Sequence, residues 1–251
     1  MKYLLALTGL SEECRAIKDI QNLIINDIIQ QGNTIDVLLC TKQHNNINYV
    51  LNEYNPIGCI FEEEPNGVKK RSLKFLRILE YYLLNKLEYD YIIHTRFDII
   101  LSQPYHMYPI KNDCFNFTCH GCGPYTYKGN TYIDTDCDLW IFPGNIEYIQ
   151  KLYNVFSTID MNRELSAHPD HIGQAFHRCN AYLNDHNIET NIMYKTLNYL
   201  ANGSLYFKFV RQHYDNIYHQ CYCDSNDFKN SNYCDLLRKY ERAFPALNWF
   251  E

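Results

Sequence analysis

Four short apolar runs, separated by stretches with helical periodicity, constrain the fold of this chain more than any other feature of its sequence. The runs occupy residues 2–8, 34–40, 56–61 and 89–95. They are too continuously apolar for strands with one face in water, so we expect strands that are buried on both faces. Strands that alternate with helices favour a mostly parallel sheet covered by helices on both sides. The sequence therefore predicts an α/β fold with a mostly parallel central sheet.

The stretches between these runs carry helix signals. Ser11, followed by two glutamates, is typical of a helix N-terminus, and Gly32 is typical of the end of that helix. We expect a weaker helix over 43–54 and a long helix over 68–88, where apolar residues recur on one side.

The pattern becomes irregular after residue 101. We expect a loop over 119–138 and three further helices, at 145–158, 169–186 and 226–242. No linker rich in Gly, Ser or Pro interrupts the chain. We therefore predict one domain, residues 1–251, with a regular half (1–101) and an irregular half (102–251).

Composition and charge narrow the function classes. The 251-residue chain has a net charge of -6 at pH 7 and a pI of about 5.9, which disfavours a surface for nucleic acid or anionic membranes. No segment approaches the roughly 20 apolar residues of an integral membrane helix, and no signal peptide is convincing. We therefore expect the 11 cysteines to be reduced thiols of a cytoplasmic protein. A structural zinc stays open as an alternative, held by two cysteine pairs: Cys119 with Cys122, and Cys221 with Cys223.

Polar residues gather where the apolar runs end, and ligands of open α/β sheets bind outside the carboxyl ends of the strands. The residues that we expect at this edge follow a run or begin the helix over 68–88: Thr8, Gly9, Thr41, Arg71, Ser72, Arg96 and Asp98. Cationic groups beside a carboxylate suit an anionic phosphate ligand with a divalent metal. An internal Arg96–Asp98 ion pair is the alternative. The glycine-rich loops of dinucleotide-binding dehydrogenases and P-loop NTPases are missing after the first run.

The stretch YDYIIHTRFDII, residues 89–100, resembles the GT-A class of nucleotide-sugar glycosyltransferases. In that class a D-x-D motif follows the fourth strand. This chain resembles the variant of small bacterial and viral transferases in which Arg96 takes the first position and Asp98 the second. The resemblance implies a GT-A-like fold and a metal-dependent glycosyltransferase of the hexosyltransferase type. Such an enzyme moves a sugar from a nucleotide-sugar donor, such as UDP-glucose or another UDP-sugar, to a glycan or other hydroxyl acceptor. Residues 1–101 would bind the donor and residues 102–251 the acceptor.

The resemblance also implies roles for individual residues. Asp98 matches the metal-ligating carboxylate and would hold Mn²⁺ or Mg²⁺, which stabilises the charge of the leaving nucleoside diphosphate. A guanidinium cannot ligate a metal, so Arg96 would pair with Asp98 or reach ligand oxygens. A late histidine often adds a metal ligand in this class, and His213 is the first candidate here and His219 the second. The other residues of the edge would border the nucleotide or approach the donor: Thr8, Gly9 and Thr41, and Arg71 and Ser72.

Three aspartates in the irregular half are candidates for acceptor chemistry. Asp136 and Asp138 precede an expected apolar strand, where a carboxylate would bind sugar hydroxyls or act as the general base. A solvated acidic turn explains them equally well. Asp170 lies in the first turn of an expected helix and resembles the acidic residue that approaches the acceptor in many GT-A enzymes. Capping of that helix is the alternative.

Two other function classes stay open. A nucleotidyltransferase shares the sheet and the use of Mg²⁺, but it usually carries a Gly-rich loop with Arg or Lys after the first strand, where this chain has TGLSEE. A nucleotide-sugar-binding module without catalysis is consistent with Arg96 in place of an acid. Measured turnover separates such a module from the transferase.

Overall fold

The protein is built around a mixed β-sheet with helices on its faces. A computed structural model describes residues 1–9, 24–62, 71–97, 99–101, 105–119, 124–133, 139–159, 179–195 and 207–209. The elements in these ranges are, in chain order, β1 (Lys2–Gly9), β2 (Thr34–Thr41), α2 (Ile47–Tyr54), β3 (Gly58–Phe61), α3 (Arg71–Leu84), β4 (Tyr91–Arg96), β5 (Ile99–Leu101), η1 (Tyr105–Met107), β6 (Phe115–Cys119), β7 (Pro124–Tyr127), β8 (Asn130–Ile133), β9 (Leu139–Pro143), α4 (Ile146–Ile159), α5 (Cys179–Asp185), β10 (Thr190–Lys195) and β11 (Phe207–Phe209). Residues 24–30 are helical as well.

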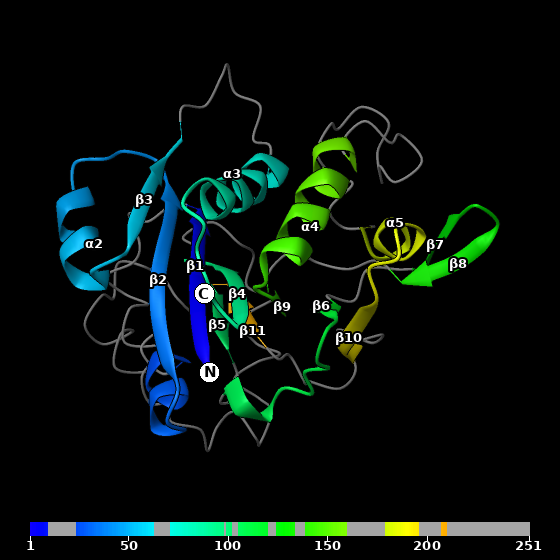
Figure 1. The fold of residues 1–251 in the computed structure, drawn as a ribbon, viewed down its shortest axis with the longest axis horizontal. Helices are drawn as coiled ribbons and strands as arrows, with labels where there is room; N and C mark the ends of the chain where they lie inside the picture. The colour runs from blue at the N-terminus through cyan, green and yellow to red at the C-terminus, as the bar shows by residue number, and fades with distance from the viewer. Residues whose placement is uncertain are drawn as a thin grey trace, which may run out of the picture.

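Seven strands form the central sheet in the order β10-β6-β9-β4-β1-β2-β3 (Figure 1). β1 pairs in parallel with β2 and β4, β2 pairs in parallel with β3, and β10 pairs in parallel with β6. β9 runs antiparallel to both of its neighbours, β4 and β6. The predicted α/β fold with a mostly parallel central sheet is therefore confirmed, and the four apolar runs form β1 to β4.

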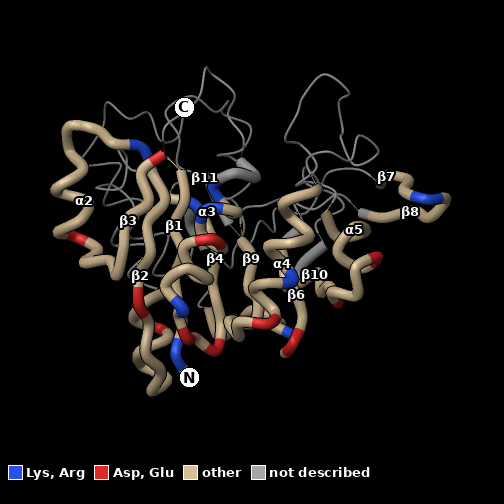
Figure 2. The backbone as a smooth tube through the Cα atoms, turned by 45° about the horizontal axis from the view of Figure 1, so that its top comes forward, with Lys and Arg blue, Asp and Glu red and all other residues tan. Residues whose placement is uncertain are grey.

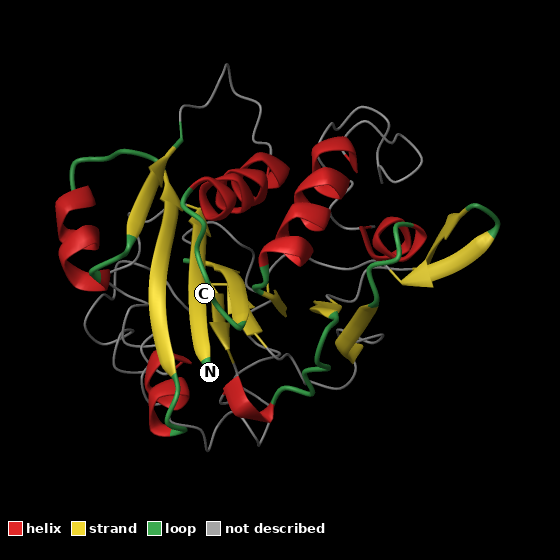
Figure 3. Cartoon of the chain, viewed as in Figure 1, coloured by secondary structure: helices red, strands yellow, loops and turns green. Residues whose placement is uncertain are grey.

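Helices and aromatic side chains cover the two faces of this sheet. Side chains along a strand alternate between the faces. Leu4 and Ala6 of β1 lie on one face, where they belong to the same buried cluster as Phe75 of α3. Helices α3 and α4 lie side by side over this face (Figure 3). On the opposite face the ring of Tyr3 meets the ring of Tyr105 in η1 edge to face, with centroids 5.8 Å apart.

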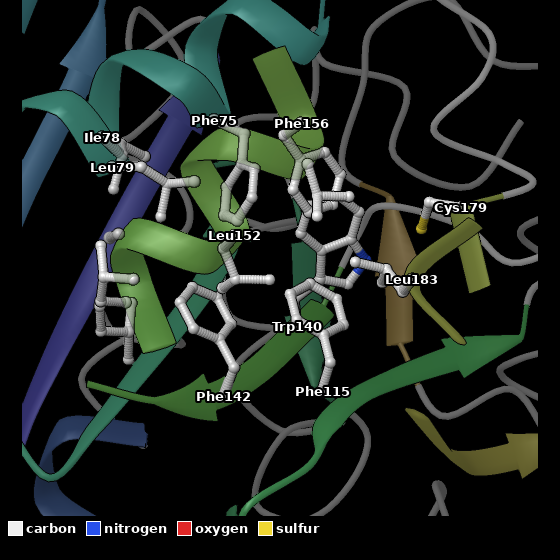
Figure 4. Close-up of a cluster of buried hydrophobic side chains, with 14 of the residues drawn as sticks. Phe75, Ile78, Leu79, Phe115, Trp140, Phe142, Leu152, Phe156, Cys179 and Leu183 are labelled. Carbon is white, nitrogen blue, oxygen red and sulfur yellow. The ribbon is translucent and has the colours of Figure 1, made fainter. Parts of the chain in front are cut away.

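Phe75 of α3 lies at the centre of an aromatic cluster (Figure 4). Its ring packs edge to face against Trp140 of β9 and Phe156 of α4, at centroid distances of 4.7 and 4.8 Å. Beside it, Phe115 of β6 and Phe142 of β9 stack with centroids 5.1 Å apart. All five side chains are fully buried. Aromatic pairs of this geometry each add about 1 kcal/mol beyond the burial of their surface. The cluster therefore holds α3 firmly against α4 and the antiparallel part of the sheet.

Helix α3 ends at Leu84, whereas the sequence predicts an end at residue 88. The amide of Lys86 donates to the carbonyl of Leu83 at 3.2 Å, and the amide of Leu87 donates to the carbonyl of Tyr82 at 3.1 Å. Lys86 has a left-handed φ of 47°. These features form a Schellman motif, which usually places glycine at the left-handed position. Because the chain has lysine there, the usual stop signal is missing and the predicted end was wrong.

The expected loop over 119–138 contains a β-hairpin, so the prediction was wrong for this segment. β7 and β8 pair antiparallel with Tyr127 opposite Asn130. The two connecting residues, Lys128 and Gly129, both have positive φ, 47° and 79°, as in a type I′ turn. The usual sequence signal for this turn is Asn-Gly or Asp-Gly, and Lys-Gly does not stand out in the same way. The hairpin is tied to α5 by the Lys128–Asp185 ion pair, whose Nζ–Oδ2 distance is 2.6 Å.

The other helix predictions agree with the structure to different extents. Helix α2 begins at Ile47, later than the predicted start at residue 43, and α4 matches the predicted helix over 145–158 to within one residue. Helix α5 covers the end of the helix predicted over 169–186, while the earlier part of it, and the helix predicted over 226–242, lie outside the described residues. None of the helices in the described ranges combines the length and the apolar character that a membrane crossing requires.

Candidate functional site

The strand order creates a switch point between β1 and β4. After β1 the chain adds β2 and β3 on one side, and it then places β4 on the other side of β1. In open α/β sheets, ligands bind in the crevice outside the carboxyl ends of the two strands where the order reverses. The register sets Thr8 at the end of β1 beside Arg96 at the end of β4. Two of the predicted binding residues therefore flank the switch point.

The backbone at the carboxyl ends of β1 and β2 is held by side-chain and main-chain hydrogen bonds. The Thr41 hydroxyl donates to the carbonyl of Gly9 at 2.8 Å. Gly9 has φ of 112°, a conformation that residues with a Cβ rarely adopt, so glycine suits the point where the chain leaves the sheet. The amide of Phe97 donates to the carbonyl of Thr8 at 3.1 Å, which continues the β1–β4 ladder past Arg96. The predicted residues Thr8, Gly9 and Thr41 thus lie on adjacent strand ends.

His94 and Arg96 lie on the same face of β4, because they are two residues apart in a strand. Both are buried, with 4% and 8% of the residue exposed. His94 Nε2 lies 3.3 Å from the Thr8 hydroxyl. Burial, together with the Arg96 guanidinium, lowers the pKa of His94 to about 3, so the imidazole is neutral at pH 7. Arg96, in contrast, is charged at every accessible pH, and its guanidinium suits the recognition of phosphate.

An ion pair lies at the carboxyl end of β3. Lys74, in the first turn of α3, places Nζ 2.7 Å from Glu62 Oε2, and the two side chains are 19% and 11% exposed. The two groups are close enough to form an ion pair, but Glu62 Oε2 accepts no hydrogen bond of good geometry from the described residues. Glu62 Oε1 also accepts a long bond from the Cys40 thiol at 3.8 Å, and burial raises the pKa of this thiol, which keeps it protonated. The ion pair shows that α3 begins beside the carboxyl ends of the strands.

Sequence reasoning missed His94, Glu62 and Lys74 at this edge. Each had a positional signal: His94 precedes the R-x-D stretch, Glu62 directly follows the third apolar run, and Lys74 lies in the first turns of the predicted long helix. Their partners, however, come from other strands or from a helix, and no local pattern indicates which partner each of them meets.

The other predicted site residues are described in part or not at all. Arg71 and Ser72 are the first two residues of α3, so their backbone lies beside the same edge. The remaining candidates lie outside the described residues: Asp98, Asp136, Asp138, Asp170, His213 and His219.

The first residues of the stretch at 89–100 have a structural role at the opposite end of the sheet. Asp90 Oδ2 accepts a hydrogen bond from the backbone amide of Lys2 at 2.6 Å. The Tyr89 hydroxyl donates to Asp36 Oδ2 at 2.7 Å, and Lys2 Nζ lies 4.2 Å from the centroid of the Tyr89 ring. Figure 2 shows acidic and basic positions together at this end, close to the N-terminus. Tyr89 and Asp90 therefore fasten β4 to β1 and β2, while Arg96 lies at the other end of the same strand.

The described residues contain no complete candidate metal site. Among them, no group of three His, Cys, Asp or Glu side chains could hold a metal. Glu62 is already paired with Lys74. A metal shell would therefore depend on Asp98 and His213. Of the cysteines in the zinc alternative, Cys119 ends β6 and the other three lie outside the described residues. The described residues also include the free thiols Cys40, Cys59 and Cys114.

Comparison with known proteins adds no family to this description. No protein-family model matches the chain, and no curated protein matches it. The switch point, the side chains around it and the sequence resemblance are therefore the features of this chain that bear on its function.

Proposed function

We propose that this protein is a metal-dependent glycosyltransferase with a GT-A-like fold, which moves a hexosyl group from a UDP-sugar to a hydroxyl acceptor. The observation that carries the proposal is the position of Thr8 and Arg96 at the switch point, with the R-x-D stretch beginning at the last residue of β4. The switch point is where open α/β sheets bind nucleotides. A buried arginine at that point suits a diphosphate.

The chemistry of sugar transfer suits a fixed positive charge at this edge. Breaking the bond between the anomeric carbon and the phosphate oxygen leaves a nucleoside diphosphate that gains negative charge. Arg96 is buried, so its charge is screened by water less than a surface charge would be. Helix α3 begins beside the same edge, and the N-terminus of a helix favours anions. A bound Mn²⁺ or Mg²⁺ would add further positive charge at the diphosphate.

The pairing of β9 with β4 supports a contribution from the aspartates of the irregular half. Leu139, the first residue of β9, pairs with Thr95 of β4. Asp138 immediately precedes Leu139 in the sequence, and Asp136 lies two residues earlier. The chain therefore enters β9 next to the carboxyl end of β4. A general base near this end would be close to the sugar that leaves the diphosphate.

The pairing of β11 with β5 supports the proposed metal ligands in the same way. Phe209, the last residue of β11, pairs with Ile99, the first residue of β5. Asp98 directly precedes Ile99, and His213 follows Phe209 by four residues. Two segments more than 100 residues apart in the sequence therefore meet at Ile99, the residue that follows Asp98 in the sequence. This pairing favours His213 over the later His219.

The proposal is tested by nucleotide binding in two variants of the same stretch, Asp98→Asn and Asp90→Asn. The dissociation constants of UDP and GDP are measured by isothermal titration calorimetry with and without Mn²⁺, and release of UDP from UDP-glucose and UDP-N-acetylglucosamine is followed with time. We expect Mn²⁺-dependent UDP binding and slow UDP release by the wild type. Asp98→Asn should weaken UDP binding at least about tenfold, which is the loss of roughly one strong charged contact.

Asp90→Asn is the matched control, because Asp90 is also a carboxylate of the stretch at 89–100 but lies at the far end of β4. It should keep the wild-type affinity for UDP. Equal losses in both variants would indicate general destabilisation and would contradict the assigned site. No binding of UDP or GDP by the wild type would overturn the proposal. Binding without release of UDP from any donor would indicate a nucleotide-sugar-binding module instead of an enzyme.

A further inference from the structure

His94 has an unusual set of neighbours for a buried polar side chain. Its ring packs against two aromatic rings of the core, Phe75 at 5.1 Å and Trp140 at 5.3 Å between centroids. Nε2 lies 3.3 Å from the Thr8 hydroxyl, whereas Nδ1 is buried and has no hydrogen-bond partner among the described residues. The Nε2 edge of the imidazole thus contacts Thr8 at the switch point, and the rest of the ring is packed in the core.

These contacts decide which nitrogen of His94 carries the proton. The Thr8 hydroxyl donates to the carbonyl of Thr95 at 3.4 Å. Because its single proton is used there, the hydroxyl can only accept from His94, so Nε2 must carry the hydrogen. The other tautomer would bury an unpaired N–H at Nδ1, which is more costly than burying an unpaired lone pair in an aromatic environment. Burial and the neighbouring Arg96 lower the pKa of His94, so the ring is neutral at pH 7 and only one of its two nitrogens carries a hydrogen.

We propose that His94 is a positioning residue of the nucleotide site: its Nε2–H orients the Thr8 hydroxyl so that Thr8 offers a hydrogen-bond acceptor to the ligand. This inference rests on the proposed function. A hydroxyl that donates to Thr95 and accepts from His94 has one lone pair left. That lone pair binds an N–H or O–H group, which a nucleoside supplies and an ionised phosphate lacks. Thr8 therefore recognises the nucleoside, whereas the guanidinium of Arg96 beside it has the chemistry that suits the phosphates.

The test compares UDP with inorganic pyrophosphate, which keeps the diphosphate charge but has no nucleoside. His94→Phe keeps an aromatic ring in the core and removes the donor. His94→Gln is the conservative variant, because the amide nitrogen of glutamine lies close to the position of Nε2. Thr8→Val removes the hydroxyl. The dissociation constants of both ligands are measured for these three variants and for the double variant with His94→Phe and Thr8→Val.

We expect His94→Phe and Thr8→Val each to weaken UDP binding about fivefold, the loss of one neutral hydrogen bond. The double variant should bind UDP no more weakly than Thr8→Val alone, and His94→Gln should stay within about twofold of the wild type. Pyrophosphate binding should be the same in all variants. A merely structural role of His94 would instead weaken both ligands equally, and it would add to the effect of Thr8→Val.

Two outcomes separate this inference from the proposed function. If the wild type binds UDP but His94→Phe binds it equally well, the inference is wrong and the function stands. If the wild type binds no nucleotide, the function fails and the inference fails with it. Nitrogen-15 NMR of the ligand-free protein checks the tautomer independently: the shifts should show His94 protonated at Nε2 and bare at Nδ1 at neutral pH, and a proton on Nδ1 would overturn the argument even if the variants fold poorly.

Discussion

Acid should destabilise this protein through His94, and replacing His94 should remove that part of the acid sensitivity. The imidazole is buried against Phe75 and Trp140, and burial, together with the charge of Arg96, lowers its pKa from the ordinary 6.5 to about 3. Between these two pH values the unfolded chain binds a proton that the folded protein does not bind. The free energy of unfolding therefore falls as the pH decreases through this window, and it is fully retained above it.

The size of the effect follows from the two pKa values. Below the unfolded pKa of 6.5, each pH unit costs the folded state about 1.4 kcal/mol for as long as the folded imidazole stays neutral. From about pH 7.5 to pH 5 the loss amounts to about 2 kcal/mol. Any folded pKa below about 4 gives nearly the same loss at pH 5, because the unfolded pKa alone then sets it. This is a large part of the stability of a typical domain.

The assay is urea unfolding of the wild type and of His94→Gln at several pH values between about 7.5 and 5. Glutamine does not titrate, so the free energy of unfolding should fall less in the variant, by about 2 kcal/mol over this range. The other nine histidines of the chain are the same in both proteins, so their contributions cancel in the difference. His186→Gln is the matched control for the substitution itself, because it makes the same chemical change at an exposed side chain. Parallel pH profiles for the wild type and His94→Gln would refute the reasoning.

Two further predictions concern the framework of the site. Phe75→Ala should lower the free energy of unfolding by about 3–5 kcal/mol, because it leaves a cavity in the aromatic cluster. Leu84→Ala, at the exposed end of the same helix, should lower it by less than about 1 kcal/mol. Equal midpoints of urea unfolding for the two variants would contradict this expectation. Asp90→Ala should lower the free energy of unfolding by about 1 kcal/mol, because the hydrogen bond to the Lys2 amide is lost. The dissociation constant of UDP should not change. A tenfold weaker affinity for UDP in calorimetry would show instead that Asp90 acts in binding.

Much of the regular half, residues 1–101, could be predicted because the sequence patterns that indicate its strands and helices are local. A strand buried on both faces needs a continuous apolar run, and each of β1 to β4 has one. Two local predictions failed where the chain uses a less common residue for a turn, namely Lys86 at the end of α3 and Lys128 in the hairpin. Both residues have positive φ, a conformation that glycine or asparagine usually signals.

For the candidate site, the sequence predicts which residues lie at strand ends but not which of them are in contact. Polar residues after apolar runs indicate which residues lie at an edge of the sheet, so the sequence predicts Thr8, Gly9, Thr41 and Arg96 at the ends of their strands. The contact between His94 and Thr8 could not be predicted, because it joins residues 86 positions apart whose strands become neighbours only after β4 is placed beside β1.

The sequence by itself determined the fold class, the strands of the regular half and the identity of several edge residues. The tertiary structure decided the strand order and hence the switch point, the antiparallel place of β9, the pairing of β11 with β5, and the Glu62–Lys74 pair. The physical reason is the range of the interactions. The apolar pattern of a segment reports how it will be buried, but its partners depend on which surfaces of the whole chain pack together, and that choice is made by contacts between segments far apart in the sequence.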